Sequence, residues 1–385
     1  MKICILNVLH DALDKRMYYK VARSLLDAGH EVVSVSPPSP FLSQDNHESV
    51  EGLPSVRFVF TEPALSFFQR FRAIFRLVKL GRRQKADLYL APEAESWVAA
   101  LLIKLCGGGR VVFDMHEYVP DEFAKFFPPF SRRLIERFTR IAMRVAGRCS
   151  DLIILTRESF EPLWNGVATP RVVVINSNWL QPATHIIPDT VRELFGDAPT
   201  VLHQGIFGES RGSLQLLEAM KLVTENMPEA RCLLLGPYVY GDGQSYREAI
   251  IAAGLEKNLI LLDEVPFEEV PAYIAAAQGG LILFQPGPVN HCLAMPHKLF
   301  DYMREGKAVI APDFAVEVSR IVKEAECGLL IDVTSPQAIA AAILQILQNP
   351  EEADRLGKQG RLAVEKKYNW QKDGALLVRA IAALE

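Results

Sequence analysis

The stretch PHKLFDYM at residues 296–303, followed by Gly306 and the apolar run 308–311, decides the fold. Proline has no amide hydrogen and fits the first helical position, so Pro296 predicts a helix start whose N–H groups and dipole favour an anion. Lys298 and Asp301 are three residues apart and therefore share a helix face. The ammonium is suited to a phosphate and the carboxylate to two ribose hydroxyls, which predicts a nucleotide-sugar site. A capped surface helix with an intrahelical Lys–Asp pair is the alternative.

Length and composition indicate a protein with two α/β domains and no membrane span. The chain has 385 residues, of which 49% are hydrophobic and 23% charged, and a domain usually takes roughly 100–200 residues. No apolar run approaches the roughly 18 residues of a spanning helix. The first residues are expected to form a buried strand rather than a signal peptide. Six cysteines are scattered without metal-ligand spacing, which favours a reducing compartment, so we expect a cytoplasmic protein.

Charge is unevenly distributed along the chain. Residues 1–190 carry 24 Lys and Arg against 20 Asp and Glu, whereas residues 191–385 carry 18 against 26. Two segments of the basic half, residues 67–83 and 123–148, combine phenylalanines and arginines at helical spacing. Such helices bind anionic membrane surfaces, where each Lys or Arg contributes about 1 kcal/mol. The alternative is that the aromatic residues pack in the core and the arginines are solvated.

Short apolar runs alternate with helical patterns, as in parallel sheets. In the first half the expected strands are residues 2–7, 31–36, 56–60, 87–90, 110–114, 152–155 and 172–175, and the expected helices are 16–28, 67–83, 96–105, 132–149 and 157–165. In the second half the expected strands are residues 200–203, 231–235, 259–262, 280–284, 308–311 and 328–331, with helices after residues 213, 245, 267, 297, 316 and 335. We predict an N-terminal domain at 1–185, a linker at 186–199, a second domain at 200–367 and a final helix at 368–385 that returns to the first domain.

The second half contains a further phosphate-binding pattern. Residues 205–212 read GIFGESRG between a predicted strand and a predicted helix. Gly205 permits close approach of the backbone, Ser210 lies near the helix start, and Arg211 supplies a permanent cation. Together with Lys298, Arg211 would place two cations at one edge of the sheet. The dinucleotide and P-loop glycine motifs are absent from the sequence.

These segments resemble the family 4 glycosyltransferases. The strongest match is residues 296–310, similar to the family pattern Pro-x-Lys-Leu-Phe-Glu-Tyr-Met-x-x-Gly-x-Pro-Val-Ile. Weaker elements follow the family order at residues 14–16, 28–32, 114–117, 205–212, 290 and 367–370. The resemblance implies a GT-B fold, in which two doubly wound Rossmann-like domains face a central cleft, and retaining transfer without a metal or other cofactor.

The resemblance also implies roles for residues in the second half. Asp301 matches the second acid of the Glu-x7-Glu motif, which binds the donor ribose, although Asp is one methylene shorter than Glu. The first acid falls at Leu293, so backbone amides from Ala294 to His297 are expected to contact the sugar, and Met295 and Pro296 count among the donor-binding residues. Ile206 stands where many members carry a diphosphate-binding arginine, which leaves Arg211, Lys298 and helix dipoles to stabilise the leaving group. Glu264 and Val265 are expected either near the base or on a surface turn.

Three residues of the first half are further candidates. His116 follows a predicted strand and is flanked by Asp114 and Glu117, where the family often places a residue that touches the transferred sugar; a buried or capping histidine is the alternative. Asp14 and Arg16 are expected either to contact the acceptor or to cap the first helix.

The expected function is sugar transfer from a nucleoside-diphosphate sugar to an acceptor hydroxyl. The acceptor is expected to be a carbohydrate or a lipid-linked glycan of surface polysaccharide or glycolipid assembly, used at the inner face of the cell membrane. Two alternatives stay open, namely a GT-B nucleotide-sugar epimerase and a weak or inactive GT-B scaffold. Near-neutral charge and the lack of a known reader motif exclude nucleic acid as a partner.

Overall fold

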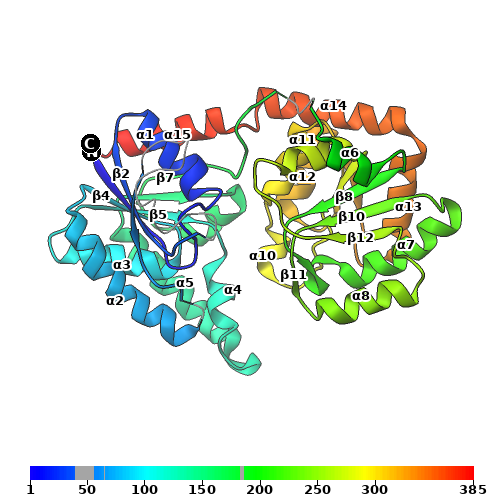
Figure 1. The fold of residues 1–385 in the computed structure, drawn as a ribbon. Coiled ribbons are helices and arrows are strands. Elements are labelled where there is room, and N and C mark those ends of the chain that lie inside the picture. The colour runs from blue at the N-terminus through cyan, green and yellow to red at the C-terminus, as the bar shows by residue number, and fades with distance from the viewer. Residues whose placement is uncertain (40–55, 65, 183–185) are drawn as a thin grey trace. The chain divides into compact units, whose positions relative to one another are not determined.

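The computed structural model describes residues 1–39, 56–64, 66–182 and 186–385, and it divides into two compact units. Unit 1 comprises Met1–Asn176 with Trp370–Glu385, and unit 2 comprises Ser177–Asn369. Each unit is built around a large parallel β-sheet with helices on its faces (Figure 1). Among the described residues no helix is long and apolar enough to cross a bilayer.

The unit 1 sheet has seven parallel strands in the order β3-β2-β1-β4-β5-β6-β7. Its strands are β1 (Lys2–Leu6), β2 (Glu31–Ser36), β3 (Arg57–Phe60), β4 (Leu88–Ala91), β5 (Arg110–Met115), β6 (Leu152–Leu155) and β7 (Arg171–Val173). The main helices are α1 (Arg23–Asp27), α2 (Phe67–Gln84), α3 (Ala94–Leu105), α4 (Val119–Ala124), α5 (Arg132–Arg148) and α15 (Trp370–Ala382), with shorter or irregular turns η1 (Met17–Ala22), η2 (Pro129–Ser131) and η3 (Glu158–Trp164). The strand order reverses between β1 and β4, because β1 connects to β2 on one side and β4 lies on the other.

The unit 2 sheet has six parallel strands in the order β12-β10-β8-β13-β14-β15. Its strands are β8 (Thr200–Gln204), β10 (Arg231–Leu235), β12 (Leu259–Leu262), β13 (Gly279–Leu281), β14 (Ala308–Pro312) and β15 (Gly328–Ile331), and β9 (Phe207–Gly208) pairs separately with β11 (Tyr238–Tyr240). The helices are α6 (Asp189–Phe195), α7 (Ser213–Asn226), α8 (Gly243–Ala252), α9 (Val270–Ala276), α10 (Val289–Cys292), α11 (His297–Arg304), α12 (Val316–Ala325), α13 (Pro336–Gln348) and α14 (Pro350–Lys366), with one turn η4 (Glu209–Arg211). Here the order reverses between β8 and β13.

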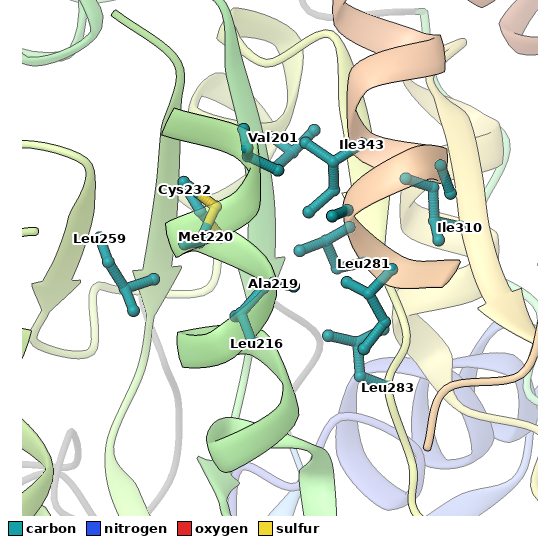
Figure 2. Close-up of a cluster of buried hydrophobic side chains, with 14 of the residues drawn as sticks. Val201, Leu216, Ala219, Met220, Cys232, Leu259, Leu281, Leu283, Ile310 and Ile343 are labelled. Carbon is teal, nitrogen blue, oxygen red and sulfur yellow. The ribbon is translucent and has the colours of Figure 1, made fainter. Parts of the chain in front are cut away.

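Apolar side chains of alternate strand residues form the core of unit 2. Figure 2 shows Leu216 and Met220 of α7 and Ile343 of α13 gathered with strand residues such as Val201 and Leu281. These side chains are almost wholly buried. Each fully buried aliphatic side chain contributes about 1.5–3 kcal/mol, so this layer fixes both helices on one face of the sheet.

Tyr302 of α11 anchors the opposite face. Its hydroxyl donates to the carbonyls of Leu202 (3.2 Å) and Leu281 (3.4 Å) and accepts from the amide of Gln204 (3.1 Å). A Cβ atom added to Gly280 would lie 2.3 Å from the Tyr302 ring. Glycine at 280 is therefore what allows α11, and with it Lys298, to lie against β8 and β13.

Several sequence expectations about the fold were wrong. The expected linker at 186–199 contains α6, whose Phe195 is buried and contacts Tyr273 (6.5 Å between ring centroids), because its apolar side chains pack within unit 2. The chain passes from unit 1 to unit 2 at residue 176/177, and the expected boundary at 185 lies outside the described residues. Segment 157–165 forms a 3₁₀ turn because Pro162 lies inside it. Helices α4 and α14 and the β9–β11 pair were not predicted.

The last helix, α15, belongs to unit 1. The Trp370 indole donates to Ser24 Oγ at 2.8 Å and lies under the cations of Arg16 and Lys20, at 5.7 and 5.6 Å. These contacts attach the end of the chain to the first helical segment of the sequence.

We predict that Gly280→Ala destabilises unit 2, because the added methyl group collides with the Tyr302 ring. Overpacking of this kind costs about 1–3 kcal/mol, so amides of β8 and β13 should exchange with deuterium roughly five times faster or more. Gly243→Ala is the matched control, because its added Cβ would meet Tyr238 only at 3.4 Å or beyond. Equal exchange in both variants would show that Gly280 does not fix Tyr302.

Candidate active site

The reversal points of the two sheets each gather polar side chains. In open parallel sheets, ligands bind beyond the carboxyl ends of the strands where the strand order reverses. In unit 2 this position is occupied by the loops after β8 and β13 together with the start of α11. In unit 1 it is occupied by the loops after β1 and β4.

Three basic side chains meet at the unit 2 reversal point. Lys298 Nζ lies 2.9 Å from His203 Nε2. Burial and the charge of Arg211 lower the pKa of Lys298 well below its ordinary value, although Asp301 partly opposes them. Burial, Lys298 and Arg211 likewise lower the pKa of His203. The three basic groups therefore disfavour one another's charged forms, and a bound anion would stabilise those charged forms.

Aromatic rings position Arg211. Its guanidinium lies 4.3 Å from the ring centroid of Phe284 and 5.5 Å from that of Tyr240. His291 stacks on Phe284 at 5.4 Å, and its Nδ1 lies 2.7 Å from the carbonyl of Gln285. These ring contacts restrict the Arg211 side chain before a ligand binds, which reduces the conformational entropy that the side chain loses on binding.

Two backbone features complete this site. Gly205 and Gly212 adopt positive φ values of 84° and 85°, and a Cβ at Gly212 would lie 2.7 Å from the Leu283 carbonyl. Ser210 is half-buried in η4, and its carbonyl accepts from the Gln285 amide at 3.1 Å. Gly212, not Ser210, is the N-cap of α7, and neither α7 nor α11 has a side-chain cap among the residues described. Their first N–H groups are oriented to favour an anion.

Asp301 differs from its expected role. Its carboxylate is 2% exposed and accepts hydrogen bonds from the side chains of Gln204 (2.7 Å) and Asn178. Lys298 meets His203 instead, so the two residues diverge although they share a helix face. The short Asp side chain does not extend to the surface, and in this geometry it positions its neighbours rather than presenting a ribose acceptor.

Other unit 2 predictions need correction. Pro296 is the N-cap of α11, one residue before the first helical position, because its ψ of 146° is extended. The amide of Ala294 donates to the His291 carbonyl (3.2 Å), so it is engaged within unit 2, and Met295 is a buried residue. His297 is half-buried at the first position of α11. Glu264 is exposed and Val265 is half-buried. Both residues follow the edge strand β12, which lies two strands away from β8, in agreement with the surface-turn alternative.

The unit 1 reversal point is organised by Glu93. Its carboxylate is 8% exposed and accepts the backbone amides of Val8, Leu9 and His10 at 2.9–3.2 Å. This residue therefore holds the loop after β1 against the end of β4. Sequence analysis missed it, and no local motif marks it.

Two histidine–aspartate pairs lie at this loop and at the end of β5. His10 Nδ1 lies 2.9 Å from Asp14 Oδ2, and His116 Nε2 lies 3.2 Å from Asp114 Oδ2. The rings of His10 and His116 meet edge to face at 5.2 Å. Burial alone would lower the pKa of His10, but the Asp14 carboxylate outweighs it and raises that pKa above its ordinary value. Burial lowers the pKa of His116, so the two imidazoles differ in charge near neutral pH.

The structure separates the roles of Asp14 and Arg16. Asp14 Oδ1 accepts the amides of Arg16 (2.8 Å) and Met17 (2.7 Å), which is the capping alternative, while its Oδ2 faces His10. Arg16 is 2% exposed and binds both oxygens of Asp114 at 3.0 Å, as well as the carbonyl of Val174. This geometry does not support Arg16 as an acceptor contact; it fastens η1 to β5. The His10-x3-Asp14 spacing was the signal that sequence analysis overlooked.

His116 and His10 line a cavity of about 300 Å³ within unit 1. The cavity is also lined by Glu93, Glu117, Phe123 and Phe126. Within the described parts of the chain, no group of three or more His, Cys, Asp or Glu side chains is arranged to hold a metal ion.

Comparison with known proteins associates both halves with one class of enzyme. Residues 15–176 match the family described as Glycosyltransferase Family 4, and residues 190–363 match the family described as Glycosyl transferases group 1. No curated protein is significantly similar to the chain by sequence.

Solved structures show the fold. Sucrose-phosphate synthase from Thermosynechococcus elongatus superposes with a TM-score of 0.77 at 18% identity over 100% of this chain and 99% of that one. Anabaena Alr3699/HepE in complex with UDP-glucose gives 0.73 at 15% identity over all of both chains. An E. coli structure described as trehalose-6-phosphate bound with UDP-2-fluoro glucose gives 0.71 at 12% identity over 100% and 99%. The two successive family matches and the shared two-sheet fold show that the chain belongs to the GT-B glycosyltransferases of group 1 and family 4.

Proposed function

We propose that the protein transfers a sugar, with retention of configuration, from a nucleoside-diphosphate sugar to an acceptor hydroxyl. The observation that carries this proposal is the group of Lys298, His203 and Arg211 at the reversal point of the unit 2 sheet. Structural neighbours that hold UDP-glucose or UDP-2-fluoro glucose support a nucleotide-sugar donor.

The chemistry requires stabilisation of a departing diphosphate. The bond between the anomeric carbon and the diphosphate oxygen breaks, and the diphosphate takes the electron pair. The acceptor oxygen forms the new bond, and its proton is released. Lys298, Arg211 and the uncapped starts of α7 and α11 would face the developing negative charge, which is usually the largest catalytic contribution. We propose that these groups carry that charge without a divalent cation, so that chelators leave turnover unchanged.

Unit 1 is the proposed acceptor side. His116, which lines the cavity, is the candidate to contact the transferred sugar. We further propose that the acceptor belongs to surface polysaccharide or glycolipid assembly at the inner face of the cell membrane.

The arrangement of aromatic residues supports membrane contact. On α2, Phe68, Phe71 and Phe75 are 56–78% exposed, whereas Ala73 and Leu77 are buried. The phenylalanines therefore do not pack in the core, contrary to the alternative drawn from the sequence. On α5, an exposed apolar stripe accompanies a stripe of arginines; its members are Leu134, Phe138, Ile141 and Val145. Such mixed surfaces bind anionic lipid.

A catalytically weak scaffold is the second candidate. Leu293 and exposed Ile206 replace polar family residues, and the Asp301 carboxylate is engaged internally. Nucleotide binding without turnover, under any acceptor, would favour it. Donor turnover that needs no acceptor would instead favour an epimerase.

We predict selective binding of one nucleoside diphosphate from a panel of UDP, GDP, ADP and dTDP, measured by calorimetry. Lys298→Met and Arg211→Gln should each weaken it about tenfold or more, because a hydrogen bond to a charged group contributes about 1.5–3 kcal/mol. Lys221→Met on the outer part of α7 is the control, because its ammonium is exposed and pairs with Glu218. Absence of binding to every nucleotide would contradict the proposal.

The same titration has a pH signature. The pKa of Lys298 is lowered in the free protein, and a bound diphosphate would raise it. Binding should therefore take up protons where Lys298 is partly neutral, which is seen by repeating the titration in buffers of different ionisation enthalpy. Lys298→Met should reduce this uptake, whereas Lys221→Met should preserve it.

We also predict sedimentation of the protein with vesicles of phosphatidylcholine and phosphatidylglycerol, but not with phosphatidylcholine alone. Neutralising Arg133 and Arg137 to Gln should weaken binding by about 2 kcal/mol, since each basic residue contributes about 1 kcal/mol. Leu105→Ser, an exposed site at the end of α3, is the control. Equal sedimentation with both vesicle types would argue against an electrostatic membrane surface.

A further inference from the structure

The unit 1 cavity lies where a parallel sheet offers a ligand site. It is bounded by the loop after β1, the β4–α3 loop, the end of β5 and α4. The strand order reverses between β1 and β4, so these loops diverge and leave space. At about 300 Å³ the cavity is at the small end of ligand pockets. It has room for the head of an acceptor but not for an extended molecule.

The inner wall of the cavity is polar and rigid. Glu93 is held by three backbone amides, and His10 is held by Asp14. His116 and Glu117 add further polar groups. Carboxylates accept hydrogen bonds from hydroxyls, and imidazoles both donate hydrogen bonds to hydroxyls and accept hydrogen bonds from them. Four of the lining residues are glutamates. Glu95 pairs with Arg70 and Glu122 with Lys125, which leaves Glu93 and Glu117 against His10, so a head that carries phosphate or carboxylate would be disfavoured.

The outer rim is apolar and exposed. Leu9, Phe123 and Phe126 line the cavity and are 48%, 38% and 49% exposed. The Arg70 guanidinium lies 5.7 Å from the Phe126 ring centroid and pairs with Glu95 at 2.7 Å, which holds the rim in place. A purely hydrophilic acceptor would gain nothing from passing this rim. An acceptor with a hydrocarbon portion would bury apolar surface on it.

The geometry points to an amphiphilic acceptor with an uncharged, hydroxyl-rich head. The head occupies the cavity at His10, His116 and Glu117, and the apolar part leaves across Leu9, Phe123 and Phe126. This inference rests on the proposed function, because it names the acceptor class of the same enzyme. It assigns a recognition role to His10, Phe123 and Phe126.

The test uses three small probes with the full chain, namely glucose, n-octyl glucoside below its micelle concentration, and n-octyl sulfate. Calorimetry should show one octyl glucoside per chain, bound about tenfold or more tightly than glucose, because burial of a few methylenes supplies that factor. Octyl sulfate should bind more weakly than octyl glucoside, because the glutamates repel its head. NMR signals of the His10 and His116 rings should shift with octyl glucoside.

Matched variants locate the binding. Leu9→Ser and Phe126→Ser should reduce octyl glucoside affinity about tenfold or more and leave weak glucose binding unchanged. Leu105→Ser carries the same substitution as Leu9→Ser at an 82% exposed site outside the cavity, and it should behave like wild type. Binding of many detergents per chain, equal losses in Leu9→Ser and Leu105→Ser, equal affinity for glucose, or a preference for octyl sulfate would each overturn the inference.

Failure of this inference is distinguishable from failure of the proposed function. The nucleotide titration depends on unit 2 residues and should be the same for wild type and Phe126→Ser. Nucleotide binding without octyl glucoside binding would reject only the amphiphilic acceptor. Octyl glucoside binding at the cavity without binding of any nucleotide would reject the transferase instead.

Discussion

The reversal of strand order in each parallel sheet is the constraint on which the rest of the structure depends. Parallel strands need crossover connections, and these are right-handed in nearly all proteins, so strands added on opposite sides of β1 or β8 send their helices to opposite faces. The loops that follow the central strands then diverge, and no backbone partner fills the space between them. Both polar clusters of this protein lie in these two spaces. Their residues come from distant parts of the sequence because the topology, not local sequence, brings strand ends together.

The two spaces are lined by different kinds of side chain, so they are suited to different ligands. In unit 1, Glu93 satisfies the backbone amides of the loop after β1, and the Arg16–Asp114 pair is fully buried with additional carbonyl partners. Losing one partner of such a pair costs about 3–5 kcal/mol, so these residues fix the shape of the site. In unit 2, Lys298, His203 and Arg211 disfavour one another's charged forms, and burial lowers the pKa of Lys298 and of His203 further. One site is preorganised for hydroxyls, and the other is held ready for an anion.

Sequence patterns predicted the sheets well but not the contacts that organise the two reversal points. Strands 31–36, 152–155, 231–235, 259–262 and 328–331 were predicted with their observed bounds because each is a short, mainly apolar run between helical patterns. The pairing of Lys298 with His203, the contact of Arg211 with the Phe284 ring, and the clamp by Glu93 were not predictable, because each joins residues at least 70 positions apart. Helical periodicity likewise identified α2 but not which face is exposed. The buried residues of this helix include Ala73 and Leu77, whereas Phe68, Phe71 and Phe75 are exposed.

Asp301 occupies a position where the family pattern has the longer glutamate. Its carboxylate is buried and accepts hydrogen bonds from Gln204 and Asn178. Gln204 ends β8, the central strand of the unit 2 sheet, and Asn178 also forms a bridge with Asn369. Residues 176/177 and 369/370 are where the chain passes between the units. Asp301 therefore connects α11, which carries Lys298, to β8 through Gln204. It also connects α11 to Asn178, which in turn bridges to Asn369. A substitution there would disturb the position of Lys298 as well as any direct contact with a nucleotide, so loss of binding in such a variant would not by itself identify a ribose ligand.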